Sequence, residues 1–298
     1  TYNYGFCVGS NGITEEWLNI KTKTGKEYKT VFYRDSEALD LVGITDRRKE
    51  ALSDAISKET LVVSMGAKMQ IKKLKAVRDW FLRACVANFG DPIENVIRSR
   101  ILPRGFTDDE SVQQSVADYF ASFDSSIIGF EVKKEQGEQS KSEHIEINAI
   151  HKMIGSGETA TIPLNEESAG TLKMFALYSD LQEVLKNGGV FFVDELNARL
   201  HPLLVRNFII TFLNSGVNKK HAQLIFTTHD SWQLSNNLLR RDEIWFTEKD
   251  TNGASTLYSL ADFVDEDGVK IRKDESYEKN YLLGKYGAIP NLKSIEIT

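Results

Sequence analysis

The chain has 298 residues, of which 41% are hydrophobic and 27% charged, and its formal net charge is −6. This length and apolar content allow one large domain or two modest ones with a sizeable core, which excludes disorder as the main state. No stretch approaches 18 uncharged apolar residues, so no membrane-spanning helix is expected. Cys7 and Cys85 are too few for a disulfide scaffold and favour a reducing, cytoplasmic compartment. The mild acidity gives no sign of constitutive nucleic-acid binding, and a local contact with nucleic acid stays open.

The N-terminal part of the chain has the composition of a sheet followed by helices. Aromatic and β-branched residues dominate 2–8, 13–20 and 28–34, which predicts three strands, with a turn over 23–26. From residue 36 to about 122, apolar residues recur at helical spacing, which predicts a mostly helical lobe. The residues that set this spacing are Ala76, Trp80, Phe81, Ala84 and Cys85, followed by Val112, Val116, Tyr119, Phe120 and Phe123.

The rest of the chain alternates strands with helices. Two strands are predicted over 127–132 and 144–151, joined by a polar, exposed loop over 133–142. From residue 164 onward the patterns predict a helix over 172–185, a buried strand over 190–193, a helix over 202–212, a strand over 223–228, a helix over 232–239 and a strand over 243–246.

This alternation indicates an α/β fold with a parallel central sheet, together with an antiparallel β part near the N-terminus and a helical lobe. The sequence divides into four segments on this basis. They are a β part over 1–35, the helical lobe over 36–122, the α/β core over 123–262 and a C-terminal tail over 263–298.

Two carboxylates follow the apolar strand over 190–193. Asp194 and Glu195 are expected at the carboxyl end of this strand, where α/β sheets bind ligands. An aspartate there can support Mg²⁺ while the metal bridges nucleotide phosphates, and a glutamate just beyond can orient and deprotonate an attacking water. For this pair taken alone, a strand that ends in a charged turn is the alternative.

Two further motifs occur in a fixed order around this acidic pair. His229 ends the next buried strand, where an imidazole could hydrogen-bond a terminal phosphate; a structural histidine is the alternative. Ser168 and Gly170 precede the helix over 172–185, and the backbone N–H groups at a helix start suit phosphate oxygens; a simple N-cap is the alternative. The combination favours phosphate binding by all three motifs.

These motifs resemble those of the ATP-binding-cassette (ABC) class of P-loop ATPases, specifically the soluble kind related to chromosome-maintenance and DNA-repair ATPases. The resemblance implies ATP and Mg²⁺ as cofactors and a head-to-tail homodimer in which each nucleotide lies between two subunits. Leu200-His201-Pro202 matches the residues that follow Walker B in the bacterial AAA-type branch. The resemblance implies that Asp194 supports the metal, Glu195 is the general base and His229 contacts the γ-phosphate. It places Ser168, Gly170 and Thr171 in the signature motif, which binds the nucleotide of the opposite subunit. Asn197 falls at the D-loop position.

The C-terminal half resembles a narrower group of prokaryotic ATPases. Residues 239–250, 257–263 and 281–290 are similar to blocks of the RloA and abortive-infection type, which is often encoded beside a small RloB-like protein and linked to phage defence. The likeness covers roughly residues 140–290. It implies an ATPase that controls an effector protein, RloB-like or other, in anti-phage defence.

One element of this family is absent from the sequence. No G-x-x-x-x-G-K-[ST] string, the Walker A loop that cradles the phosphates, occurs in the 298 residues. Residues 155–160 fit the dinucleotide pattern G-x-G-x-x-A, but Thr161-Ile162-Pro163 follows instead of a helix, so no pyrophosphate site is expected there. The expectation from the family is that the Walker A region lies upstream and that this chain alone is inactive.

Two other classes of function remain open at this stage. The chain could be a non-catalytic interaction scaffold that keeps the ATPase fold. It could also be a DNA-processing or repair ATPase, although the segment over 36–122 is short for a long coiled-coil arm. A Walker A string encoded in the same gene would favour an enzyme over the scaffold.

Overall fold

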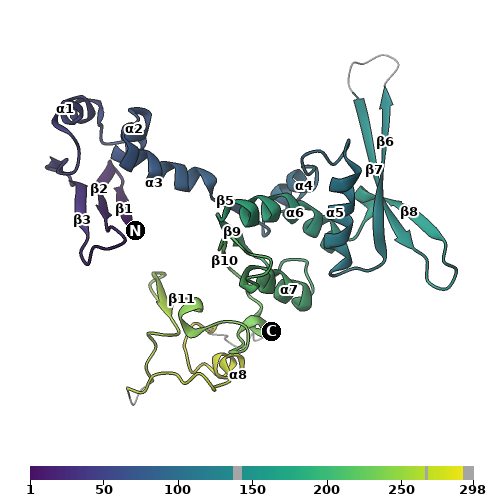
Figure 1. Ribbon diagram of the computed structural model, residues 1–298. Helices are drawn as coiled ribbons and strands as arrows, with labels where there is room; N and C mark the ends of the chain where they lie inside the picture. The colour runs from purple at the N-terminus through teal and green to yellow at the C-terminus, as the bar shows by residue number, and fades with distance from the viewer. Residues whose placement is uncertain (137–142, 266–267, 291–298) are drawn as a thin grey trace, which may run out of the picture. The chain divides into compact units, whose positions relative to one another are not determined.

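The computed structural model describes residues 1–136, 143–265 and 268–290 and divides the chain into two units, Thr1–Ala84 and Cys85–Thr298 (Figure 1). The buried apolar residues of each unit pack against one another within that unit. The finer division of the sequence into four segments stays a prediction.

The first unit combines an antiparallel sheet with helices that cover one of its faces. Its elements are β1 (Tyr2–Gly9), β2 (Gly12–Ile20), β3 (Lys29–Arg34), β4 (Leu39–Asp40), α1 (Asp46–Ala55), α2 (Val62–Lys68) and α3 (Lys72–Arg83). The three predicted strands and the turn near residue 25 are confirmed. Leu18 and Phe32 point to the same face because side chains alternate along a strand, and both are fully buried with Leu52 and Leu74 of the helices.

A buried carboxylate joins this sheet to α2. Glu16 of β2 accepts hydrogen bonds from the backbone N–H groups of Val62 and Val63, at 2.7 and 3.1 Å, and so caps the start of the helix. The hydroxyl of Tyr4 also donates to Glu16, and the Arg34 guanidinium lies 4.0 Å away. Burial raises the pKa of the Glu16 carboxyl, although these hydrogen bonds oppose the shift.

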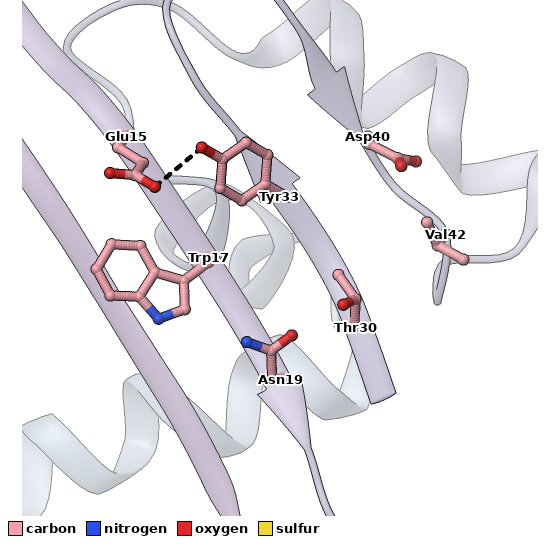
Figure 2. Close-up of a pocket in the computed structure, with 7 residues that line it drawn as sticks. All are labelled: Glu15, Trp17, Asn19, Thr30, Tyr33, Asp40 and Val42. Atoms are coloured by element: carbon pink, nitrogen blue, oxygen red, sulfur yellow. Dashed lines mark hydrogen bonds between the residues drawn. The ribbon is translucent and has the colours of Figure 1, made fainter. Parts of the chain in front are cut away.

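The opposite face of the sheet carries an open hollow of about 450 Å³ (Figure 2). The residues that line it are Glu15, Trp17, Asn19, Thr30, Tyr33, Asp40 and Val42. The Tyr33 hydroxyl donates to Glu15 over 2.9 Å. The indole of Trp17 lies against Gly5 of β1, where a Cβ would come within 2.2 Å of the ring. The hollow contains none of the residues that the sequence assigns to the nucleotide.

The prediction of a mostly helical segment over 36–122 is wrong at residues 85–88. α3 ends at Arg83, and the strand β5 (Cys85–Asn88) follows it. Cys85 therefore lies in a strand and not on the helix to which the spacing assigned it. β5 pairs with a strand far away in the sequence, so local periodicity carries no trace of the pairing. Within α3 the buried residues are Leu74 and Val77.

The second unit has strands in separate sheets, with helices around the parallel one (Figure 1). Its helices are α4 (Pro92–Ser99), α5 (Glu110–Ala121), α6 (Ala169–Asn187), α7 (Pro202–Leu213) and α8 (Tyr277–Leu282), with short 3₁₀ turns at Leu164–Glu166, Ser231–Gln233 and Arg241–Glu243. After β5 its strands are β6 (Ile127–Gln136), β7 (Glu143–Lys152), β8 (Thr159–Pro163), β9 (Val190–Asp194), β10 (Gln223–Phe226), β11 (Trp245–Lys249) and β12 (Ser255–Ser259).

The predicted parallel sheet is present in part. In the described chain it has three strands in the order β10-β9-β5, with β9 in the middle and parallel to both neighbours. Phe191 of β9 and Phe175 of α6 are fully buried in one apolar core, and the packing fixes the helix against the strand. The four apolar residues before Asp194 thus place that aspartate at the carboxyl edge of the sheet.

Other differences from the sequence patterns are local. β6 continues to Gln136, so the predicted loop over 133–142 begins as a strand; residues 137–142 lie outside the described chain. Only a 3₁₀ turn, Ser231–Gln233, occurs where a helix over 232–239 was predicted. β11 pairs antiparallel with β12 and is not a strand of the parallel sheet. β8, not a helix, follows the glycines at 155 and 157, so the absence of a helix after them is as predicted.

Candidate functional site

The candidate site lies at the carboxyl ends of β9 and β10. Because these strands are parallel and adjacent, Asp194 and the segment Thr227–His229 emerge at the same edge of the sheet. The backbone N–H of Leu196 donates to the carbonyl of Thr227 over 3.0 Å, which continues the pairing beyond the strands. The structure therefore brings the acidic pair and the histidine together.

Glu195 and His229 contact each other directly. Nε2 of His229 lies 2.9 Å from Oε1 of Glu195. The histidine side chain is 85% exposed, whereas that of Glu195 is 29% exposed. Glu195 also has a φ of 55°, in the left-handed region that non-glycine residues seldom adopt. This backbone turn at the strand end directs the glutamate away from the path of β9 and toward the histidine.

Thr227, which the sequence motifs did not single out, connects the two carboxylate residues. Its hydroxyl donates to Oδ1 of Asp194 and accepts a hydrogen bond from the backbone N–H of Glu195 over 2.9 Å. A hydroxyl can do both at once because it has one donor and two lone pairs. The signal in the sequence is its place directly after the apolar run of β10, two residues before His229. The sequence predicted a buried strand here, but the residues of β10 are exposed or half-buried.

Asn197 supports the histidine segment. Its Oδ1 accepts hydrogen bonds from the Thr228 hydroxyl, over 2.9 Å, and from the backbone N–H of His229, over 3.3 Å. In the structure the Asn197 side chain therefore fixes the chain at Thr228 and His229.

Ser168, Gly170 and Thr171 form the start of α6. Ser168 is the N-cap: its hydroxyl accepts from the backbone N–H of Thr171 over 3.1 Å and lies 2.8 Å from the Thr171 hydroxyl. A Cβ on Gly170 would lie 3.4 Å from the carbonyl oxygen of Arg199, so the helix start approaches the loop after Glu195 closely. The structure shows the capping geometry, and the phosphate contact of these residues stays a proposal.

A buried lysine on α6, which the sequence motifs also missed, contacts the same loop. Nζ of Lys173 donates to the carbonyl oxygens of Glu195, Leu196 and Ala198, at 3.4, 2.9 and 2.7 Å. It also lies 4.2 Å from the centre of the Phe89 ring. Burial lowers the pKa of this ammonium to about 7, and the Glu195 carboxylate opposes that shift. Helical spacing alone would assign this position to the apolar face.

The end of β5 forms another side of the site. The backbone N–H of Phe89 donates to the carbonyl oxygen of Asp194 over 2.9 Å. At Gly90 a Cβ would lie 3.1 Å from Cγ of Glu195, so the glycine leaves room for the glutamate. Because β5 was predicted as helix, none of these contacts could be predicted.

The donor set at this edge fits Mg²⁺ held together with a nucleotide. Asp194 is exposed and offers carboxylate oxygens, the ligands that Mg²⁺ prefers. Among the residues that the structure describes, no group of three or more His, Cys, Asp or Glu side chains could hold a metal by itself. Mg²⁺ characteristically binds through one or two carboxylates, waters and substrate phosphates, so this sparse set is compatible with it.

An acidic pair and a histidine at the carboxyl edge of a parallel sheet, within a mixed α/β unit, are consistent with the P-loop NTPase class. The family comparison then settles the relationship. Residues 2–231 match the family described as "AAA domain, putative AbiEii toxin, Type IV TA system", and the chain belongs to this family of AAA-type P-loop ATPases related to abortive-infection proteins. No curated protein matches the chain.

Crossing a bilayer as a helix requires a long, apolar segment. None of the helices in the described part of the chain is both long enough and apolar enough to cross a membrane.

Proposed function

We propose that the protein is an ATP-hydrolysing switch of the ABC type that acts as a head-to-tail dimer. The observation that carries this proposal is the contact between Glu195 and His229 beside Asp194, at the carboxyl edge of the sheet, in a chain of the AAA family. A general base, a metal-supporting carboxylate and an imidazole that contacts phosphate are three of the groups that can promote hydrolysis of a terminal phosphate.

Each residue has a distinct role in this proposal. Glu195 takes the proton of the attacking water at its carboxylate. Thr227 orients the Asp194 carboxylate and holds the backbone of Glu195, since its hydroxyl donates to the first and accepts from the N–H of the second. His229 is exposed enough to exchange its contact with Glu195 for one with the γ-phosphate. Asp194 would support Mg²⁺, which when bound neutralises charge on the phosphates.

The second half of each site would come from the opposite subunit. The N-cap hydroxyl of Ser168, the backbone of Gly170 and the hydroxyl of Thr171 lie at the start of a 19-residue helix, whose dipole favours anions at this end. Asn197 would line the same nucleotide through the D-loop. Two copies arranged head to tail would then enclose two nucleotides.

The experiment compares the polypeptide as its gene encodes it with the Glu195→Gln variant. Glutamine keeps the shape but cannot accept a proton, so ATP turnover should fall by about 100-fold or more. The variant should also accumulate as an ATP-bound dimer, seen by size-exclusion chromatography with ATP. Glu183→Gln, an exposed glutamate on α6, is the matched control and should keep wild-type turnover. Unchanged turnover in Glu195→Gln would overturn the assignment of the base.

A non-catalytic scaffold is the second candidate function. The 298 residues contain no Walker A string, which favours weak nucleotide binding by this chain on its own. In the same experiment, the scaffold predicts no turnover even in the wild-type polypeptide.

We extend the proposal to anti-phage defence through the description of the family, which names an abortive-infection toxin. ATP-dependent closure of the dimer would control an effector protein, for which an RloB-like partner is one candidate. Co-purification of a neighbouring gene product, dependent on ATP, tests this extension.

A further inference from the structure

Lys173 is a buried lysine in the first turns of α6, with 5% of its surface exposed. Lysine is seldom buried to this degree unless its charge is compensated. Among the described residues its hydrogen-bond partners are backbone carbonyls and not a carboxylate. An ammonium has three protons, and three carbonyl oxygens of one short loop surround it.

These contacts stabilise an unfavourable loop conformation. The loop begins at Glu195, with φ 55°, and ends at Arg199, with φ 60°, two left-handed residues that are not glycine. Between them the carbonyl groups of residues 195, 196 and 198 point toward one atom. Carbonyl dipoles in this arrangement repel one another, and the hydrogen bonds that Nζ of Lys173 donates to them offset that cost.

The same loop approaches the helix start at Gly170, where a side chain would contact the carbonyl oxygen of Arg199. Lys173 and Gly170 thus join the first turn of α6 to the loop that carries Glu195. We propose that Lys173 is a positioning residue that holds the 195–198 loop, and with it the Glu195 carboxylate, in a fixed relation to the start of α6.

This inference rests on the proposed function for its consequence. In the dimer, Ser168 and Gly170 would contact the partner's nucleotide, while Glu195 acts on the nucleotide of its own subunit. Lys173 would then couple the two sites. A phosphate bound at the start of α6 would affect the position of the Glu195 carboxylate through the 195–198 loop.

The first test does not require ATP. In Lys173→Met, which keeps the length and loses the donors, the carbonyls lose their partner. Hydrogen exchange at Leu196, Ala198 and Leu200 should become roughly tenfold faster or more, since their N–H groups depend on the loop. Exchange in β9 should stay as in the wild type. Lys186→Met, on an exposed position of the same helix, is the matched control and should change neither.

Lys173→Gln gives a milder second variant in case the methionine variant fails to fold. Its side chain keeps two N–H donors but is shorter, so the loop should exchange at a rate between those of the wild type and Lys173→Met. Wild-type exchange in the loop of both folded variants would overturn the positioning role.

Steady-state kinetics of the polypeptide as its gene encodes it separates the two proposals. The kcat of Lys173→Gln should fall by about tenfold or more with KM changed less than about threefold, because the base is misplaced while the phosphate contacts remain. Faster loop exchange with wild-type kcat would overturn the link to Glu195. Faster loop exchange with no turnover in the wild type would instead overturn the proposed ATPase and leave the structural role of Lys173 intact.

Discussion

At the scale of single residues, the site depends on side chains that stabilise unfavourable backbone conformations. Glu195 and Arg199 have left-handed φ angles, and such conformations cost about 1–3 kcal/mol each unless the surroundings enforce them. Thr227 and Lys173 provide that enforcement by bonding to the strand end and to the loop carbonyls. Strained backbone and its compensation are therefore found in the same loop as the proposed base.

Glu16 allows a test of a buried carboxylate in the first unit. In Glu16→Gln, an NH₂ group replaces one of the two carboxylate oxygens. This group is a donor and cannot accept from the N–H of Val62 or Val63, so the unit should lose about 2 kcal/mol of stability at neutral pH. Hydrogen exchange of the α2 amides measures this loss. Glu15→Gln, on the opposite face of the same strand, is the matched control and should change stability by less than about 0.5 kcal/mol.

The pH dependence of the same unit has a definite sign. The folded-state pKa of Glu16 is raised above its unfolded value, so in the window between the two values the folded state holds more protons. The free energy of unfolding should therefore decrease as pH rises through this window, from just above the ordinary glutamate pKa, and level off beyond the raised pKa. Glu16→Gln should lack this slope. An equal slope in both proteins would contradict the assignment.

The site residues were predictable where they follow an apolar run, and unpredictable where a contact joins segments that are distant in the sequence. Asp194, Glu195 and His229 each follow an apolar run, so the strand ends placed them at one edge of the sheet. Lys173 looked like one more position on an apolar helix, because its partners are carbonyls whose direction depends on the backbone of another loop. The roles assigned to these residues stay predictions.

At the scale of elements, α6 connects the core to the site, and its C-terminus is fixed by one glycine. Gly188 has φ 69° and lies against the next loop: a Cβ would come within 2.5 Å of the carbonyl oxygen of Lys220. Gly188→Ala should therefore destabilise the second unit by at least about 2 kcal/mol, from the left-handed strain and the clash together. Urea unfolding of the full chain measures the loss.

Gly155 is the matched control for this prediction. Its φ is 90°, but nothing lies within 4 Å of the position of a Cβ. Gly155→Ala should thus show the conformational cost alone, about 1 kcal/mol. An equal loss in the two variants would show that the clash with Lys220 does not contribute.

Element types were predicted best where burial gives a sustained pattern. The 19 residues of α6 and the apolar run of β9 were evident, because helix period and strand burial both leave a local trace. β5 has four residues and is a strand because it pairs with β9. The helical spacing of the residues before it therefore dominated the sequence pattern. The segment over 232–239 had helical composition, yet side-chain bonds of Asp230 and Gln233 hold a 3₁₀ turn there.

At the scale of the whole molecule, the family match extends over residues 2–231 and so includes parts of both units. All the proposed site residues, from Ser168 to His229, lie inside it. β11, β12 and α8 lie beyond it and form a small core of their own, in which Tyr286 and Leu260 are fully buried. The resemblance of residues 239–290 to RloA-type proteins therefore stays a prediction from the sequence.

The separation of the cores leads to a prediction about unfolding of the full chain. Leu74 is fully buried in the core of the first unit and Phe175 in that of the second, and truncation of either to alanine should cost about 2–5 kcal/mol. Because the described core residues around each side chain belong to the same unit as that side chain, calorimetry should resolve two transitions. Leu74→Ala should lower the midpoint temperature of the transition of the first unit, and Phe175→Ala that of the second. A single transition lowered by both substitutions would mean that the two units unfold as one cooperative structure.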